Sequence, residues 1–348
     1  MMAVHNRNNG LDILKFICIV LEILAHTGAL KNSFPVNLEP LCRFVVPIFF
    51  MITGFYYDQT EKRGRVMGQI KKVLLLIVIA NVTLIVLNMA YCLINSESII
   101  DWALSCFTKR RIFNMLLFNE NCIVGHFGSL HIWYLNALLY VLIISAICRK
   151  LGIFKILFII APLLYIGGLV VEYFSSQLFG VNFGAAGYFF YYRNFMTLGI
   201  PYFCIGFLLN RYKDRFKWNN IVLMILSIVF IGITFLELYL SDKLSLSSNG
   251  EMFIVSPSCS VCVFLLFYNY YKEKRLNWFE KGISFSGRKY VVWIYIFNLP
   301  IIVLIMDIMS KLGFNDQNLI IVSTLSLMVT LAISFGIDHL SGIIKNRT

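Results

Sequence analysis

The sequence predicts an all-α integral membrane protein, a polytopic bundle of about ten transmembrane helices with both termini in the cytoplasm. Apolar residues fill 59% of the 348 positions and charged residues 14%, whereas soluble domains hold about 45–50% and about 25%. The apolar residues gather in runs of about 20, the length that crosses the hydrocarbon core of a bilayer. This composition excludes an ordinary water-soluble enzyme and a disordered chain.

Ten such runs follow one another, each about as long as a spanning helix must be at 1.5 Å per residue. The first two are the least apolar, but a bundle tolerates polar residues that face its interior. We expect one membrane domain over 1–348 with no separate soluble domain, and no cleavable signal peptide because the first run is charged. The runs are 11–30, 38–57, 73–94, 130–148, 153–173, 194–210, 219–240, 252–271, 289–309 and 318–340.

Positive charges predict the orientation, because the cytoplasmic side of a membrane protein is rich in Lys and Arg. Of the 30 Lys and Arg, 21 fall on one side if the N-terminus is cytoplasmic, and six fall on the other. The outer connections include the two longest, 95–129 and 174–192, and the largest outer cluster of cations is 109–111. A helix lying on the membrane surface is one interpretation of 95–129.

The net charge of +12 therefore indicates orientation in the cell membrane, and we expect no nucleic-acid partner. The nine cysteines show no metal-binding spacing, so no metal site is expected. Cys106 and Cys122 share the 95–129 connection, where a disulfide and two free thiols are both compatible with the sequence.

Ionisable residues in the first run are the strongest sign of a functional site, because a charge inside a membrane costs about 2.5–3.5 kcal/mol. At about 100° per residue, Asp12, Lys15, Glu22 and His26 share an arc of about 80°. Lys15 and His26 lie about 16 Å apart along the helix axis. Lys15 and Asp12 are thus predicted near the cytoplasmic end, and His26 near the outer end.

Glu22 and His26 are i,i+4 neighbours that can pair directly. A carboxylate beside an imidazole favours the protonated ring or fixes its tautomer, as a general base near neutral pH requires. Two other interpretations remain open. The pairs Asp12–Lys15 and Glu22–His26 could only lock helices together, or they could line a proton or substrate path in a transporter.

Five further residues are candidates for substrate binding, each beside a simpler explanation. Arg43 could reach the interface as a snorkelling side chain, and Trp133 and Tyr134 could belong to an aromatic interface belt. Arg193 opposes the helix dipole at the outer start of the sixth run, so it needs an anionic partner or a ligand. Asn298 is polar at mid-span, which a helix–helix hydrogen bond would also explain.

Together these residues resemble the acyltransferase-3 family of polytopic membrane proteins over essentially the whole length. That family's first span carries an Asp, an Arg and, eleven residues after the Arg, an essential His. Asp12, Lys15 and His26 occupy this pattern.

Two further segments carry the resemblance. RFVVPIFFMITGFYY resembles the family's second-span motif and maps Arg43, Pro47 and Gly54. We expect the proline to kink this helix and the glycine to permit close approach or hinging. HIWYLNALLY resembles the motif H-L-W-Y-L-x-A-L and maps His131, Trp133 and Tyr134.

The resemblance implies transfer of an acyl group, commonly acetyl from acetyl-CoA, to a hydroxyl of a cell-envelope carbohydrate or polymer. Acyl-CoA would be the donor substrate, and no bound cofactor is implied. His26 would deprotonate the acceptor or relay the acyl group, with Glu22 beside it, and Lys15 would hold the anionic donor. The chain departs from the family at Lys15, which lacks the bidentate fork of arginine, and at Asn298, where many members have His.

One branch of the family resembles the membrane half of vancomycin-resistance serine racemases, in which this module is thought to supply serine. The alternative function is therefore a membrane transporter for a small amino acid such as serine, serving a partner racemase. A third interpretation is an export partner for an envelope polymer or lipid that carries out no chemistry. The expected partners are acyl-CoA, an envelope acceptor, the lipid bilayer, and either a racemase or an envelope-synthesis protein.

Overall fold

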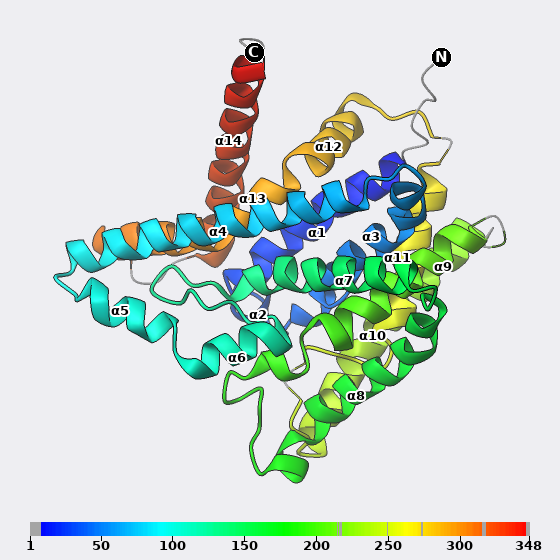
Figure 1. Ribbon diagram of the computed structural model, residues 1–348, viewed down its shortest axis with the longest axis horizontal. Helices are drawn as coiled ribbons and strands as arrows, with labels where there is room; N and C mark the ends of the chain where they lie inside the picture. The colour runs from blue at the N-terminus through cyan, green and yellow to red at the C-terminus, as the bar shows by residue number, and fades with distance from the viewer. Residues whose placement is uncertain are drawn as a thin grey trace. The chain divides into compact units, whose positions relative to one another are not determined.

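The computed structural model describes residues 8–345 except 214, 216, 217, 249, 273 and 315–317, and over these residues the chain forms helices and no strand (Figure 1). Seven of the described helices are long and apolar enough to cross a membrane. The chain is an all-helical, multi-pass membrane protein by this measure. It divides into two compact units, each assembled from segments that are distant in sequence.

The first unit comprises residues 1–48, 213–231 and 258–348. Most of its helices come from the two ends of the chain, and the first half of α10 (Asn220–Lys243) comes from the middle. The others are α1 (Asn9–His26), α2 (Ala29–Asn32), η1 (Glu39–Cys42), most of α11 (Ser256–Tyr270), α12 (Trp278–Lys289), α13 (Val291–Lys311) and α14 (Leu319–Lys345). α1 is central, because α12, α13 and α14 all pack against it and α2 and η1 fold back onto it. The predicted charged face therefore lies on the helix that this unit surrounds.

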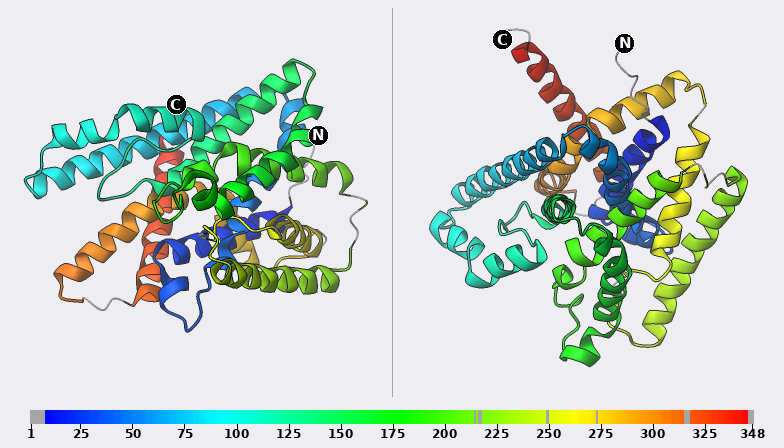
Figure 2. Two further views of the ribbon diagram at one scale, coloured as in Figure 1. Left: turned by 90° about the horizontal axis from the view of Figure 1, so that it is seen from below. Right: turned by 45° about the vertical axis from the view of Figure 1, so that its right-hand side comes forward.

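The second unit comprises residues 49–212 and 232–257. Its helices are most of α3 (Val45–Lys62), α4 (Val66–Ile94), α5 (Ile99–Cys106), α6 (Lys109–Phe118), η2 (Leu130–Ile132), α7 (Trp133–Lys150), α8 (Lys155–Phe179), η3 (Phe189–Tyr191), the π-helical turn η4 (Phe195–Gly199), α9 (Ile200–Tyr212) and the second half of α10 (Asn220–Lys243). α4 contacts α7, and α8 packs on α9 and η4 (Figure 2). α6 contacts η3. Because α6 lies in the 95–129 connection and η3 in the 174–192 connection, the two long connections predicted to face outward touch each other.

Each predicted apolar run coincides with a helix, yet α1, α9 and α11 are not among the seven spanning candidates. α1 carries three charged residues, and α9 and α11 have only 13 and 15 residues. The number of spans and their orientation stay predictions. The 95–129 connection contains α5 and α6, so its helical character agrees with the surface-helix interpretation.

The expected proline kink in the second run is wrong. Pro47 lies in the first turn of α3, which begins at Val45. Proline is accommodated there because the first amides of a helix have no intrahelical partner to lose.

Cys106 and Cys122 are both free thiols, so the disulfide alternative is wrong. The Cys106 Sγ lies 3.4 Å from the carbonyl oxygen of Val124, and the Cys122 Sγ lies 3.6 Å from that of Arg111. Burial raises the pKa of the Cys122 thiol, which keeps it protonated near neutral pH.

Gly54 serves close approach, one of its two predicted roles. A Cβ on Gly54 would overlap the carbonyl group of Phe203, and a Cβ on Gly206 would overlap that of Met51. Each of α3 and α9 thus presents a glycine to the backbone of the other. Backbone atoms cannot rotate out of the way, so both positions require glycine.

We predict that Gly206→Ala lowers the free energy of unfolding by about 1–3 kcal/mol, the usual cost of forcing extra volume into a packed site. The thermal unfolding midpoint of the purified protein in detergent measures this loss. Gly232→Ala on α10 is the matched control, because no atom lies within 4 Å of a Cβ there. Equal midpoints for the two variants would contradict the close packing of α3 and α9.

Candidate functional site

The charged face of α1 begins at a well-fixed helix start. The side chain of Asn8 caps α1 by accepting a hydrogen bond from the Leu11 amide at 3.1 Å, and it donates to the Tyr268 carbonyl oxygen at 2.8 Å. Asp12 lies in the first turn, where a carboxylate interacts favourably with the helix dipole. The N-terminal part of α1 is therefore tied to α11 before the charged residues begin.

The first charged pair is an ion pair between Asp12 and Lys15, with 2.7 Å between Oδ1 and Nζ. Asp12 is only 2% exposed, whereas Lys15 is half-buried. α12 closes over this pair, because a Cβ on Gly287 would overlap the Asp12 carbonyl oxygen. The ammonium group of Lys15 is the more accessible member of the pair.

The second charged pair joins Glu22 and His26, whose Oε1 and Nε2 atoms lie 3.0 Å apart. Both side chains are half-buried, and the His26 Nε2 atom that faces Glu22 is itself covered. The end of α1 is anchored to α14, because the hydroxyls of Thr27 and Ser323 lie 2.7 Å apart. His26 is thus held at a fixed helix end beside a carboxylate that can orient its ring.

The remaining candidates of the first unit lie on elements that pack on α1. Arg43 follows η1, and its Nη2 lies 3.8 Å from Oε2 of Glu39. The Cys42 thiol donates to the Leu21 carbonyl oxygen at 3.4 Å, which brings this segment beside α1. Asn298 is fully buried on α13, and its Nδ2 has no hydrogen-bond partner among the described residues. A helix–helix hydrogen bond from this nitrogen is therefore absent from the part of the chain that the structure describes.

The second unit brings Trp133 and Arg193 together. The Arg193 guanidinium lies over the Trp133 ring at 5.2 Å and over the Phe189 ring at 5.2 Å. Its Nη1 also forms an ion pair with Oε2 of Glu251 at 3.1 Å. Glu251 is therefore the anionic partner that we expect for Arg193, a cation at the start of a helix. Tyr134 is turned elsewhere, because its ring packs on Phe50 at 4.8 Å between centroids.

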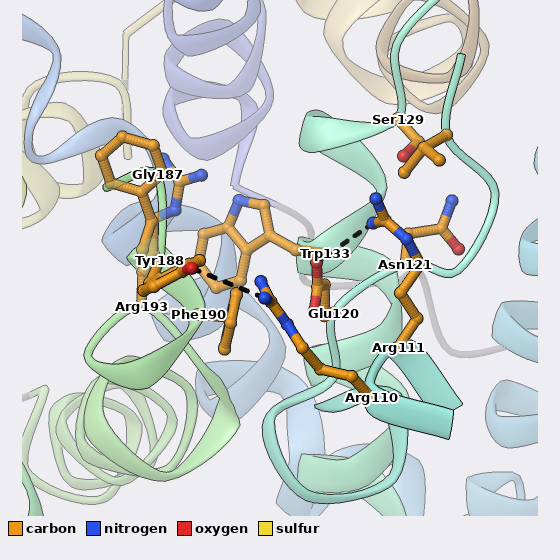
Figure 3. A pocket seen from close by; sticks show the side chains of 12 residues that line it. Arg110, Arg111, Glu120, Asn121, Ser129, Trp133, Gly187, Tyr188, Phe190 and Arg193 are labelled. Carbon is orange, nitrogen blue, oxygen red and sulfur yellow. Dashed lines mark hydrogen bonds and ion pairs between the residues drawn. The ribbon is translucent and has the colours of Figure 1, made fainter. Parts of the chain in front are cut away.

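A pocket of about 300 Å³ opens beside Trp133 and Arg193 (Figure 3). Its other walls come from α6 with the loop after it and from the segment 187–190. Arg111 lies 3.6 Å from Glu120, and Arg110 lies over the Tyr188 ring at 4.7 Å. The pocket is lined by Arg110, Arg111, Glu120, Asn121, Val124, Ser129, Trp133, Gly187, Tyr188, Phe189, Phe190 and Arg193.

Asn119 is outside the pocket lining but links the walls of the pocket through hydrogen bonds. Its backbone has a left-handed conformation, with φ of 54°. Its Nδ2 donates to the Trp133 carbonyl oxygen at 3.3 Å, and its Oδ1 accepts from the Phe195 amide at 2.8 Å. A fully buried asparagine therefore connects the end of α6 to α7 and η4.

Glu172 positions the ion-pair partner of Arg193. This carboxylate is 1% exposed, and its Oε1 accepts from the Glu251 amide at 2.7 Å and from the Ser248 hydroxyl at 3.1 Å. The chain around Glu251 is thereby fixed against α8.

Arg110, Asn121 and Glu251 are site residues that sequence reasoning missed. The signal for Arg110 was present in the outer cluster 109–111, which runs against the predicted charge asymmetry. No pattern in the sequence singles out Asn121 or Glu251. Among the described residues, no group of three or more His, Cys, Asp or Glu side chains could hold a metal ion.

Comparison with known proteins yields one family and one distant relative. The family model described as Acyltransferase domain matches residues 8–339. A protein named amino-acid racemase in Enterococcus faecalis is 22% identical over 328 residues, which are 88% of this chain and 42% of the relative. The chain thus spans less than half the length of that relative. No solved structure matches the chain significantly.

Proposed function

Because the chain belongs to the acyltransferase-3 family of membrane proteins, we propose that it transfers an acyl group, most simply acetyl, from acyl-CoA to a hydroxyl of a cell-envelope carbohydrate or polymer. The observation that supports this proposal is the Glu22–His26 pair at one end of α1, with 3.0 Å between Oε1 and Nε2. This arrangement provides a base with an orienting carboxylate, as general acid–base catalysis requires. Family membership supports the acyl-transfer class, and the charged face supports the residues.

In this proposal His26 accepts the proton of the acceptor hydroxyl as its oxygen attacks the thioester carbonyl of the donor. The carbon–sulfur bond then breaks, and the leaving CoA sulfur takes a proton from the imidazolium. Glu22 stabilises that imidazolium and selects the ring tautomer. The balance is one ester formed, one thioester consumed and one free thiol released.

Lys15 and Asp12 belong to the donor end of α1 in the proposed arrangement. The ammonium group of Lys15 would attract the phosphates of acyl-CoA, and its ion pair with Asp12 at 2.7 Å fixes where that charge lies. Arg43 follows the segment that contacts Leu21 of α1, so it would add a second cation nearer the Glu22–His26 pair. Asn298 would add a buried hydrogen-bond donor. The predicted orientation supports a donor on the cytoplasmic side, in the plasma membrane, and an exported acceptor.

A direct test compares cell envelopes from cells with and without this protein by mass spectrometry. We expect a hydroxyl-linked acyl group to be lost when the protein is absent. Purified protein in lipid nanodiscs should then release free CoA thiol from acetyl-CoA only when an envelope fraction is added. An unchanged envelope together with no thiol release would refute the proposal.

Transport of a small amino acid such as serine is the second candidate function. Two observations favour it: the relative named amino-acid racemase, of which this chain spans 42%, and the replacement of family residues at Lys15 and Asn298. In this case a separately encoded racemase would be the partner. Uptake of radiolabelled serine into proteoliposomes without acyl-CoA distinguishes transport from acyl transfer.

A further inference from the structure

We propose that the pocket of the second unit, between α6 and the segment 187–193, binds an acidic sugar unit of the acceptor through a carboxylate or phosphate. The identification of the ligand as the acceptor rests on the proposed function. The binding of an acidic sugar unit is argued from the pocket alone. Both wall segments belong to connections that the charge pattern predicts to face outward. An exported acceptor would be present on that side.

The charges of the pocket are not balanced. Two of its three guanidinium groups have a carboxylate beside them, since Arg111 lies 3.6 Å from Glu120 and Arg193 lies 3.1 Å from Glu251. Arg110 has no carboxylate partner among the described residues. Its contacts are the face of the Tyr188 ring at 4.7 Å and the Tyr188 hydroxyl at 3.5 Å. One positive charge at this pocket is therefore available to an anion.

A hydrogen-bond donor accompanies this free charge. Asn121 is 7% exposed and lines the pocket, and its Nδ2 has no hydrogen-bond partner in the described part of the chain. Buried polar groups are rarely left without a partner, because desolvation without a hydrogen bond costs about 1–3 kcal/mol. A ligand that supplies an acceptor oxygen would satisfy Asn121. A guanidinium and an amide N–H together suit an oxyanion.

The other surfaces of the pocket suit a ring. Trp133, Tyr188 and Phe190 line the pocket with aromatic surface, and Figure 3 shows Trp133 between the arginines. Arg193 covers one face of the Trp133 ring and Arg110 one face of the Tyr188 ring, which leaves ring edges and Phe190 toward the ligand. A pyranose has apolar C–H faces that pack on aromatic rings, and its anionic substituent would reach the arginines at the rim. A volume of about 300 Å³ lies at the lower end of the range for ligand pockets, which suits one sugar unit.

The pocket is also preformed. Asn119 joins the end of α6 to Trp133 and Phe195, and Glu172 fixes the chain that carries Glu251. These bonds hold the walls in place before any ligand arrives, which lowers the entropic cost of binding.

The experiment measures binding of defined oligosaccharides to the purified full chain in nanodiscs by calorimetry, without acyl-CoA. The probes are trigalacturonate, its methyl ester, and maltotriose with and without a phosphate on O6. We expect at least one acidic probe to bind tenfold or more tightly than its neutral counterpart. If trigalacturonate shows the larger preference, the anion is a carboxylate. If the phosphorylated maltotriose shows it, the anion is a phosphate.

Arg110→Gln should reduce this preference to less than threefold, because it removes the unpaired charge. Lys109→Gln is the matched control, with the same charge change one residue away on α6 and outside the pocket lining. Asn121→Asp, which places a negative charge in the pocket, should weaken the acidic probe and spare the neutral one.

Equal binding of acidic and neutral probes would overturn the inference, as would binding of neither or an Arg110→Gln variant that keeps the preference. Because no acyl transfer is read, these results are independent of the proposed function. Transfer to envelope acceptors with no acidic preference would leave the proposed function standing and remove this inference. Preferential binding of an acidic probe without any acyl transfer would support this inference and remove the proposed function.

Discussion

Replacement of His26 by alanine is expected to lower the rate of acyl transfer by about 10²- to 10⁴-fold, the usual contribution of a general base. The fold should persist, because His26 is the last residue of α1 and is half-buried. An i,i+4 pair of this kind contributes only about 0.3–0.5 kcal/mol at an exposed site. Release of CoA thiol from acetyl-CoA by protein in nanodiscs, with an envelope fraction as acceptor, measures the rate.

His339→Ala is the matched control for this prediction. His339 is exposed on α14 and stacks on Phe335, and it belongs to neither charged pair of α1. Glu22→Gln should slow transfer by a smaller factor, because the base remains but loses its orienting carboxylate. If His26→Ala transfers acyl groups as fast as His339→Ala, the proposed role of His26 is wrong.

Replacement of Lys15 by methionine is expected to raise the KM for acyl-CoA by about 10- to 100-fold, because a charge-assisted hydrogen bond contributes about 1.5–3 kcal/mol. The kcat should change little if Lys15 acts in donor binding rather than at the reacting atoms. Steady-state kinetics with acetyl-CoA as the varied substrate separate the two parameters.

Lys15→Arg tests the same site in the other direction. Arginine keeps the charge and adds the planar fork that binds phosphate through two N–H groups. Donor affinity should therefore be retained or improved, provided that the pair with Asp12 is kept. Equal KM values for the methionine and arginine variants would show that Lys15 holds no donor. Lys15→Met leaves Asp12 buried without this partner, so the folding of this variant must be checked as well. Its thermal unfolding midpoint distinguishes a loss of folding from a loss of donor binding.

The local features of the protein could be predicted well from the sequence. A period of 3.6 residues is a property of one helix, so the shared arc of Asp12, Lys15, Glu22 and His26 needs no knowledge of the fold. Both pairs form as their spacing predicts, at i,i+3 and i,i+4. The ten apolar runs each contain a helix for the same reason.

Features that join distant segments could not be predicted in this way. The glycines at 54 and 206 lie on helices far apart in sequence, and only their packing shows that each faces the other's backbone. Whether Pro47 lies in the first turn or in the middle of α3 depends on where that helix begins. It begins at Val45, just after η1, which packs on α1. Helix boundaries of this kind are set by capping and packing, which periodicity does not record.

The sequence by itself determined that this chain is a helical membrane protein with one charged helix face, because lipid makes buried charge rare and helical spacing is local. Tertiary structure alone decided the pocket. Arg110, Asn121, Trp133 and Arg193 come from separate segments, and they meet because Asn119 bonds to α7 and η4 and because Glu172 fixes the partner of Arg193. A hydrogen bond between residues 76 positions apart leaves no period in the sequence.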